Sequence, residues 1–203
     1  MPPWTKRRGY RDADVHLTIY RWGIENHLTV VQSPAGTRTA ATYDGGGKRR
    51  NYADSVILRN FLWDGENIAR QTDVNGATNR NYTLNPQAYG ELISQDGPAF
   101  HHYDALGSTR TLTDGSQTVT DTRDYRAFGA TNASSGTNVN RFWWVGRLGY
   151  YFQPDTQDHW VRARVYRPQM GRWVNRDPYR RLRTEAYAEY AYGPNDPVSG
   201  RDP

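Results

Sequence analysis

The sequence predicts an all-β protein, and three observations lead to that prediction. Aromatic residues make up 13% of the chain, and flat rings pack well on the pleated, half-buried faces of strands. An aromatic residue also recurs at intervals of about 20 positions, and turn-forming dipeptides separate the recurrences. We therefore expect a repeat-built strip of antiparallel hairpins with at most one short helix.

The repeat consists of an aromatic residue followed by a small, polar or charged residue. Its occurrences are Trp22-Gly23, Tyr43-Asp44, Trp63-Asp64, Tyr82-Thr83, Tyr103-Asp104 and Tyr125-Arg126. Successive aromatic positions lie 21, 20, 19, 21 and 22 residues apart. A propeller blade needs about 40 to 45 residues and four strands, so this period fits a single hairpin instead.

Turn signals divide each unit again. Asn75-Gly76, Asp96-Gly97 and Asp114-Gly115 are dipeptides that supply the positive φ of a tight hairpin. Between Ser108 and Tyr125, threonines alternate with other residues on both sides of Asp114-Gly115. This alternation predicts a hairpin with a two-residue turn.

The last third of the chain is less regular. Ala130–Asn140 is rich in Ser, Asn, Thr and Gly without an apolar pattern, which indicates a loop. Val161–Val165 alternates small apolar residues with arginines, which predicts one strand. Residues 180–192 are the only span where apolar spacing allows a short helix. We divide the chain into a poorly ordered N-terminal segment (1–19), hairpin repeats (20–130) and a C-terminal core or plug (131–203).

Composition excludes several kinds of chemistry. The chain has no cysteine, so it has no disulfide framework, cysteine-based zinc site or thiol nucleophile. The adjacent His101 and His102 would point to opposite faces of a strand, so we expect no metal site and no cofactor. No run approaches the roughly 18 apolar residues of a membrane span, and the N-terminus has no signal-peptide pattern.

The net charge of +5 leaves two interpretations open. Arg141-Phe142-Trp143-Trp144 and the arginines at 162, 164 and 167 interleave cations with rings, as single-strand nucleic-acid binders do. Arginines stacked over neighbouring rings within a sheet explain the same pattern. We expect the second arrangement and no nucleic-acid binding, and we find no constellation typical of a nuclease.

Six segments follow one another in a distinctive order along the chain. They are Tyr20-Arg21-Trp22, Leu62-Trp63-Asp64-Gly65-Glu66-Asn67, His102-Tyr103-Asp104-Ala105-Leu106-Gly107-Ser108-Thr109-Arg110, Tyr125-Arg126-Ala127-Phe128-Gly129, Val161-Arg162-Ala163-Arg164-Val165-Tyr166 and Gly171-Arg172-Trp173-Val174-Asn175-Arg176-Asp177-Pro178. Taken together, they resemble the C-terminal repeat-associated core region of bacterial RHS/YD-repeat proteins. The resemblance covers residues 20–203.

The resemblance implies a structural scaffold. Proteins of this polymorphic-toxin and toxin-complex family form a β-sheet strip that spirals into a hollow shell, and the core region closes one end around a toxin or effector encoded after it. This chain would then be the closing part of such a shell, without its cargo. Its partners would be the rest of the shell or the cargo, and its location would be secreted or at the cell surface. Because six hairpins leave strand edges unpaired, we also expect self-association.

The resemblance also implies an aspartic autoprotease site that releases the cargo. The matching residues are Arg176, Asp177 and Asp202. Two close carboxylates cannot both ionise comfortably, so one keeps a proton while the other activates water. The chain departs from the family pattern after Pro178, and it ends at Pro203, before the bond that the family cuts. The alternative is that Asp177 is a turn residue that accepts backbone hydrogen bonds. A further alternative is that the protein is classified by a nuclease toxin that its relatives carry.

Overall fold

The computed structural model describes residues 6–11, 17–33, 36, 38–87, 89–176, 190–193 and 195–197. These residues form a 13-stranded sheet, a four-stranded sheet and one turn of 3-10 helix. The all-β prediction is confirmed. Residues 180–189 of the predicted helix lie outside the described residues, and in the remaining three Ala191 forms an isolated bridge with Arg172.

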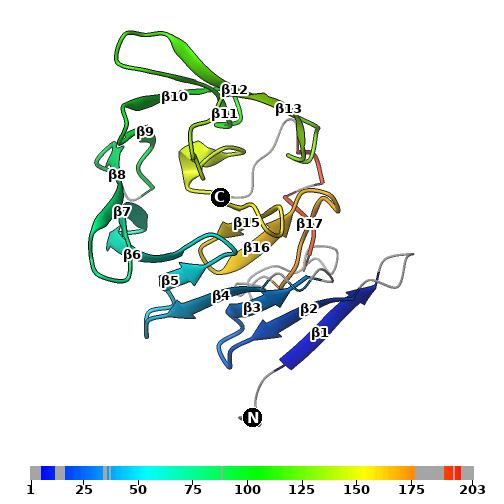
Figure 1. Cartoon of the computed structure of the whole chain (residues 1–203). Helices are drawn as coiled ribbons and strands as arrows, with labels where there is room; N and C mark the ends of the chain where they lie inside the picture. The colour runs from blue at the N-terminus through cyan, green and yellow to red at the C-terminus, as the bar shows by residue number, and fades with distance from the viewer. Residues whose placement is uncertain are drawn as a thin grey trace.

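The large sheet, called the strip below, follows chain order from β1 to β13, and every pairing that joins neighbours is antiparallel. Its strands are β1 (Lys6–Arg11), β2 (Leu17–Trp22), β3 (Leu28–Gln32), β4 (Arg38–Tyr43), β5 (Arg49–Ala53), β6 (Leu58–Asp64), β7 (Asn67–Thr72), β8 (Thr78–Leu84), β9 (Leu92–Gln95), β10 (Ala99–Tyr103), β11 (Thr109–Thr113), β12 (Val119–Tyr125) and β13 (Thr131–Ser135). Figure 1 shows that the strip curls around the C-terminal strands, so that it has an inner and an outer face.

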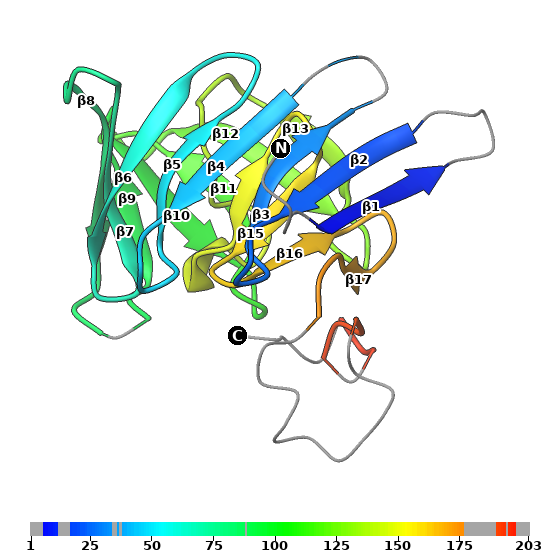
Figure 2. The same cartoon turned by 90° about the horizontal axis from the view of Figure 1, so that it is seen from below.

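The second sheet lies inside the curl (Figures 1 and 2). Its strands are β14 (Tyr151–Gln153), β15 (Asp158–Val161), β16 (Arg164–Arg167) and β17 (Arg172–Trp173), preceded by the 3-10 turn η1 (Gly146–Leu148). Residues 141–173, which contain this sheet, are called the C-terminal layer below. The fold is therefore two layers, with the core between them.

The sequence repeat corresponds to the even-numbered strands. Each repeat aromatic lies at or near the end of β2, β4, β6, β8, β10 or β12. Because all even strands run in the same direction, these rings gather along the side of the strip where the even strands end. In five of the six strands a register shift falls directly before the aromatic, at Trp22, Tyr43, Trp63, Tyr103 and Tyr125. Bulges bend a strand and increase its twist, so the repeat supplies the curvature of the strip.

The repeat aromatics also carry a recurring hydrogen bond. In four units the polar tip of the ring donates to the carbonyl of the first residue of the preceding odd strand. The donor and acceptor pairs are Tyr43 with Leu28 (2.8 Å), Trp63 with Arg49 (2.8 Å), Tyr103 with Leu92, and Tyr125 with Thr109 (2.6 Å). One side chain therefore packs its ring against the sheet and ties two neighbouring strands together.

Most turns after the even strands share one geometry with two of the turns after odd strands. The first residue of a five-residue loop accepts an N–H from the fourth, which has positive φ in each case: Asn26, Gly47, Gly76, Gly107, Gln117 and Gly129. Four of the loops begin with aspartate, whose Oδ1 accepts the N–H groups of the third and fifth residues: Asp44, Asp73, Asp104 and Asp114. The acidic residue of the repeat is thus a turn residue.

Three local predictions were wrong. The hairpin after Thr113 has this wider loop and not a two-residue turn, because Asp114 holds the N–H groups of Ser116 and Thr118. Residues 131–135 of the predicted loop form the edge strand β13, whose exposed side chains carry no apolar signal. Val161–Val165 is not one strand, because Arg162, at φ 50°, begins a tight turn between β15 and β16.

The division into 1–19, 20–130 and 131–203 remains a prediction. Within its first segment, Lys6–Arg11 forms β1 and pairs with β2 in continuous register. Within its last segment, 131–203, strand β13 still belongs to the strip.

Candidate functional site

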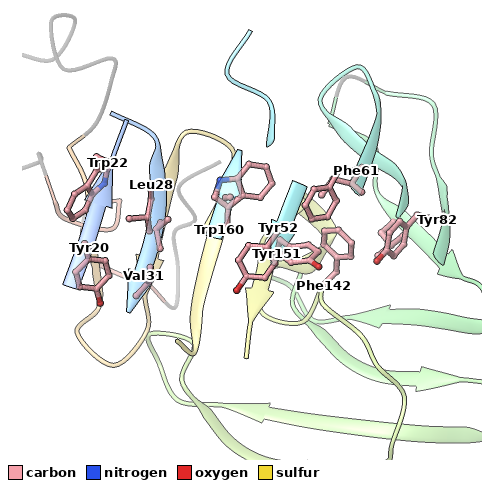
Figure 3. Close-up of a cluster of buried hydrophobic side chains, with 14 residues drawn as sticks. Tyr20, Trp22, Leu28, Val31, Tyr52, Phe61, Tyr82, Phe142, Tyr151 and Trp160 are labelled. Atoms are coloured by element: carbon pink, nitrogen blue, oxygen red, sulfur yellow. The ribbon is translucent and has the colours of Figure 1, made fainter. Parts of the chain in front are cut away.

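The candidate site is the seam, the interface between the inner face of the strip and the C-terminal layer. Figure 3 shows rings from both layers facing one another. The ring pairs that cross the seam are Tyr52 with Tyr151 (6.3 Å between centroids), Phe61 with Tyr151 (5.4 Å), Trp63 with Trp160 (5.7 Å) and Tyr82 with Phe142 (5.1 Å). All four meet edge to face, which the charge distribution of aromatic rings favours.

Backbone hydrogen bonds join the start of the C-terminal layer to β11. Thr109 donates its N–H to the carbonyl of Trp143 (2.8 Å) and its hydroxyl to the carbonyl of Phe142 (2.7 Å). Val145 donates its N–H to the hydroxyl of Ser108 (3.1 Å). Ser108 and Thr109 are completely buried, so these bonds are shielded from water and fix where the layer meets the strip.

A buried ion network crosses the seam next to these contacts. The Asp54 carboxylate, whose side chain is 0% exposed, lies 2.7 Å from Arg59 of the strip and 3.2 Å from Arg141 of the C-terminal layer. Burial by itself would raise the pKa of Asp54, but the N–H of Ile57 and the Arg59 guanidinium outweigh it, and the pKa is lowered. The carboxylate is therefore charged and bridges the two layers.

A second buried pair lies near the first strands. Arg167 donates two hydrogen bonds to the Asp158 carboxylate, both 2.9 Å long, and a third to the hydroxyl of Tyr20 on β2. This forked geometry is the arrangement that a guanidinium and a carboxylate prefer. The open end of the β15–β16 hairpin, opposite its turn, is thereby attached to the N-terminal part of the strip.

Trp144 is the centre of the second core cluster, at the end of the layer. It is 2% exposed and stacks on Tyr166 with 4.8 Å between centroids. Tyr150 and Tyr192 pack against the same indole at 5.6 and 5.2 Å. Tyr192 belongs to the segment after the undescribed residues 177–189, so this cluster holds the returning chain against the layer.

Of the predicted catalytic residues, only Arg176 lies in the described part of the chain; Asp177 and Asp202 lie outside it. Arg176 is exposed, and its Nε donates to the hydroxyl of Tyr190 (3.3 Å). Trp173 donates its N–H to the carbonyl of Tyr190 (2.9 Å), which sets this residue beside β17. Tyr190 therefore lies beside Arg176 and β17.

The cation-and-ring motifs of the sequence are used inside the protein. Phe142, Trp143 and Trp144 are at most 5% exposed. Arg164 lies 3.8 Å from the centroid of the Trp173 ring, and Arg162 lies 4.3 Å from that of Tyr89. The rings of the 142–144 motif are therefore covered by other protein side chains.

The two adjacent histidines point to opposite faces, as predicted. His101 is 7% exposed, and His102 lies on the exposed face of β10. Within the described ranges, no group of three His, Asp or Glu side chains could hold a metal ion. In the same part of the chain, no helix is long and apolar enough to cross a membrane.

Sequence reasoning missed the ion bridge of the seam. Asp54 and Arg141 are 87 positions apart, and the cation-and-ring motif that contains Arg141 gave no sign of a carboxylate partner. The only local signal was Asp54-Ser55 at a turn position, which predicts a cap and nothing across the interface.

Comparisons with known proteins extend these observations. No family model matches the chain. It is 30% identical over 209 aligned positions to a tRNA3(Ser)-specific nuclease WapA of Bacillus spizizenii, covering 97% of this chain and 9% of that protein. It is 29% identical to a tRNA nuclease WapA of Bacillus subtilis, again over 9% of that protein. A double-stranded DNA deaminase toxin A of Burkholderia cenocepacia is 26% identical, over 16% of its length. The chain thus spans about a tenth to a sixth of these relatives.

Solved structures show the same fold. A chain of the Photorhabdus luminescens Tc holotoxin pore matches 95% of this chain with a TM-score of 0.67 at 16% identity, over 10% of its own length. A TcdB2-TccC3 structure without its hypervariable C-terminal region matches 92% with a TM-score of 0.65, also over 10% of its length. The fold is that of an RHS-type β-shell. The sequential strip wrapped around a C-terminal layer is the part of that fold which this chain contains.

Proposed function

We propose that this chain is the closing segment of an RHS/YD-repeat shell that encloses a C-terminal toxin or effector. In this proposal the strip is the last part of the wall, and the C-terminal layer is the plug that fills its inner face. The observation that carries the proposal is the seam, where four edge-to-face ring pairs and the Asp54 bridge hold the layer inside the curl.

The activities of the relatives do not carry over to this chain by themselves. A tRNA nuclease and a DNA deaminase are activities of whole proteins, of which this chain spans only about a tenth to a sixth. We propose that the chain corresponds to a scaffold portion of such toxins, that its partners are the remaining shell and the cargo, and that it acts outside the cell or at its surface.

An activity and binding assay separates the scaffold from its rival. The purified chain, incubated with tRNA and with double-stranded DNA, is expected to leave both unchanged and to give no shifted band at physiological salt. Submicromolar binding that is lost when Arg162 and Arg164 are changed together to alanine would favour a nucleic-acid-binding protein.

A residual aspartic autoprotease is the second candidate, and the position of Arg176 favours it. Arg176 donates to the hydroxyl of Tyr190, a residue from the same C-terminal part of the sequence as Asp202. In this proposal Arg176 holds one carboxylate ionised, and Asp177 and Asp202 share a proton.

Adding a scissile bond tests this site. The chain extended past Pro203 with the family's Gly-Leu stretch and a reporter is expected to release the reporter, while the unextended chain stays at full length. Asp177→Asn should stop release while unfolding remains unchanged, because the amide keeps the shape and loses the proton chemistry. Release at the parental rate by Asp177→Asn would show that Asp177 is a turn residue.

A further inference from the structure

Arg49, the first residue of β5, is a buried guanidinium without a carboxylate partner. It is 1% exposed, and its Cζ lies 4.1 Å from the ring centroid of Trp160 and 5.0 Å from that of Tyr52. Its Nη2 donates to the hydroxyl of Tyr43 (3.3 Å), but its Nε and Nη1 have no hydrogen-bond partner among the described residues. Ring faces stabilise the charge, yet they leave these two in-plane donors unsatisfied.

Two more residues that line the same cavity as Arg49 carry a buried polar atom without a partner in the described part of the chain. They are Tyr52, 1% exposed, through its hydroxyl, and Gln153, 2% exposed, through Oε1. The cavity measures ≈ 10 Å³ and lies between β3, β4 and β5 of the strip and β14 of the C-terminal layer. That volume suits one water-sized occupant. Buried polar groups are rarely left unpaired, so three around one cavity indicate a ligand.

The local charge distinguishes an ion from a water molecule. The charged groups that act on Tyr52, which lines the cavity, are Arg49, Asp54 and Asp155. Asp54 already pairs with Arg59 and Arg141, and Asp155 binds Ser55 in an exposed contact. Asp158, opposite Gln153 in the register of β14 and β15, pairs with Arg167. Each of these carboxylates therefore has its own partner, and Arg49 is left with ring neighbours. A water molecule could satisfy the hydrogen bonds at Arg49, but it would not offset this buried positive charge.

We propose that this cavity is a binding site for one small inorganic anion of halide size. Arg49 Nε–H and Nη1–H and the Tyr52 hydroxyl would donate to it, and the Gln153 amide would turn its NH₂ group inward, since its two ends are interchangeable in shape. The volume excludes larger oxyanions. The site goes beyond the scaffold function proposed above, because it makes the joining of β5 to β14 depend on a bound halide.

The unmodified chain provides the first test. ³⁵Cl NMR should show broadening of the chloride line on adding the protein, and bromide should reverse it. Thermal unfolding should shift upward by about 3 to 6 °C between sodium gluconate and sodium chloride at equal ionic strength. Equal ionic strength keeps the screening of surface charges constant. No broadening, together with equal midpoints in the two salts, would show that only water occupies the cavity and would overturn the proposal.

Two variants on neighbouring residues locate the site. Arg49→Met replaces the buried guanidinium with an apolar chain of similar length, and Arg50→Met changes the exposed arginine next to it on the opposite face of β5. The midpoint shift and the line broadening should disappear in Arg49→Met and remain in Arg50→Met. A chloride response that survives Arg49→Met would place the anion elsewhere and refute the assignment. If Arg49→Met does not fold, the same comparison is made with Gln153→Leu, and the NMR result on the parent still decides whether halide binds.

Discussion

At the scale of single residues, two histidines are buried without a charge partner. His101 Nδ1 lies 3.2 Å from Thr109 Oγ1, and that hydroxyl already donates to Phe142. His101 therefore donates through Nδ1, and its Nε2 stays unprotonated in a site with no partner. Burial lowers the pKa of His101 to about 3, with a smaller contribution from the nearby His102. Burial also lowers the pKa of His159 to about 3, and the charge of Arg123 adds to this effect. Both imidazoles are neutral at pH 7.

These pKa values predict acid sensitivity. A folded-state pKa below the unfolded value of about 6.5 means that the unfolded chain binds the proton more tightly. The contribution of each neutral, buried histidine to folding stability is thus complete above about pH 6.5 and is lost as the pH falls toward 3. We expect about 2 to 3 kcal/mol less stability per histidine at pH 4.5 than at pH 7. Urea unfolding across this range measures the loss.

Single substitutions assign that pH dependence to the buried rings. His159→Phe keeps an aromatic ring beside Trp144 and Phe152 and removes the titrating group, so its unfolding free energy should depend less steeply on pH. His102→Asn, on the exposed face of the same strand as His101, should leave the slope unchanged. Equal slopes in all three proteins would mean that other groups cause the acid sensitivity.

At the scale of elements, the repeat aromatics act through their polar tips as well as their rings. Tyr125 donates to the carbonyl of the fully buried Thr109, so Tyr125→Phe would leave that carbonyl without this partner. We expect a loss of about 1 to 2 kcal/mol in the free energy of unfolding by chemical denaturation. Tyr89→Phe, at a 51% exposed residue, should cost almost nothing. Similar costs for both would show that the hydroxyl of Tyr125 is dispensable.

A glycine at the β12–β13 turn is needed for packing as well as for backbone conformation. Gly129 has a φ of +86°, and a Cβ there would lie 2.3 Å from the Trp144 ring. Gly76 has almost the same φ, +85°, and open space around it. Gly76→Ala should therefore show only the backbone strain of about 1 kcal/mol, whereas Gly129→Ala should cost at least about 3 kcal/mol or prevent folding. Thermal unfolding of the two variants gives the difference, and equal losses would contradict the role of Trp144.

Sequence patterns predicted the hairpins of the strip, because the signal for a hairpin is local. The 20-residue spacing of Trp22, Tyr43 and Trp63 reports hairpins, because each ring occupies the same place on successive even strands. The turn at Arg162 was missed, because a positive φ at arginine has no sequence signature and the flanking Val161 and Val165 imitate one strand. The catalytic prediction stays untested at Asp177 and Asp202, which lie outside the described residues.

At the scale of the whole molecule, the seam is made of contacts that no local pattern encodes. Trp63 and Trp160 meet edge to face although the chain between them forms most of the strip. Fold class and strip order follow from the repeat, but which ring covers which depends on how far the bulges bend the strip. The positions of the bulges can be identified only once the register of strand pairing is known.

The two edges of the strip predict self-association. Among the described residues, β1 and β13 each pair on one side only, so their outer edges are where another chain could add a strand. We expect sedimentation velocity to show dimers or larger species that increase with concentration. Ala133→Lys on β13 places a charge on that edge and should shift the distribution toward monomer. A concentration-independent monomer for the parent would show that both edges are protected.

The order of the two layers along the chain has a consequence for biosynthesis. Trp63 leaves the ribosome 97 residues before Trp160, its partner across the seam. At about 5 to 20 residues per second, the ring-bearing face of the nascent strip stays uncovered for roughly 5 to 20 s. During that interval the inner rings are available to neighbouring nascent chains on the same messenger RNA, so the yield of folded protein should depend on translation speed through codons 64–160 and on chaperones that shield aromatic surfaces.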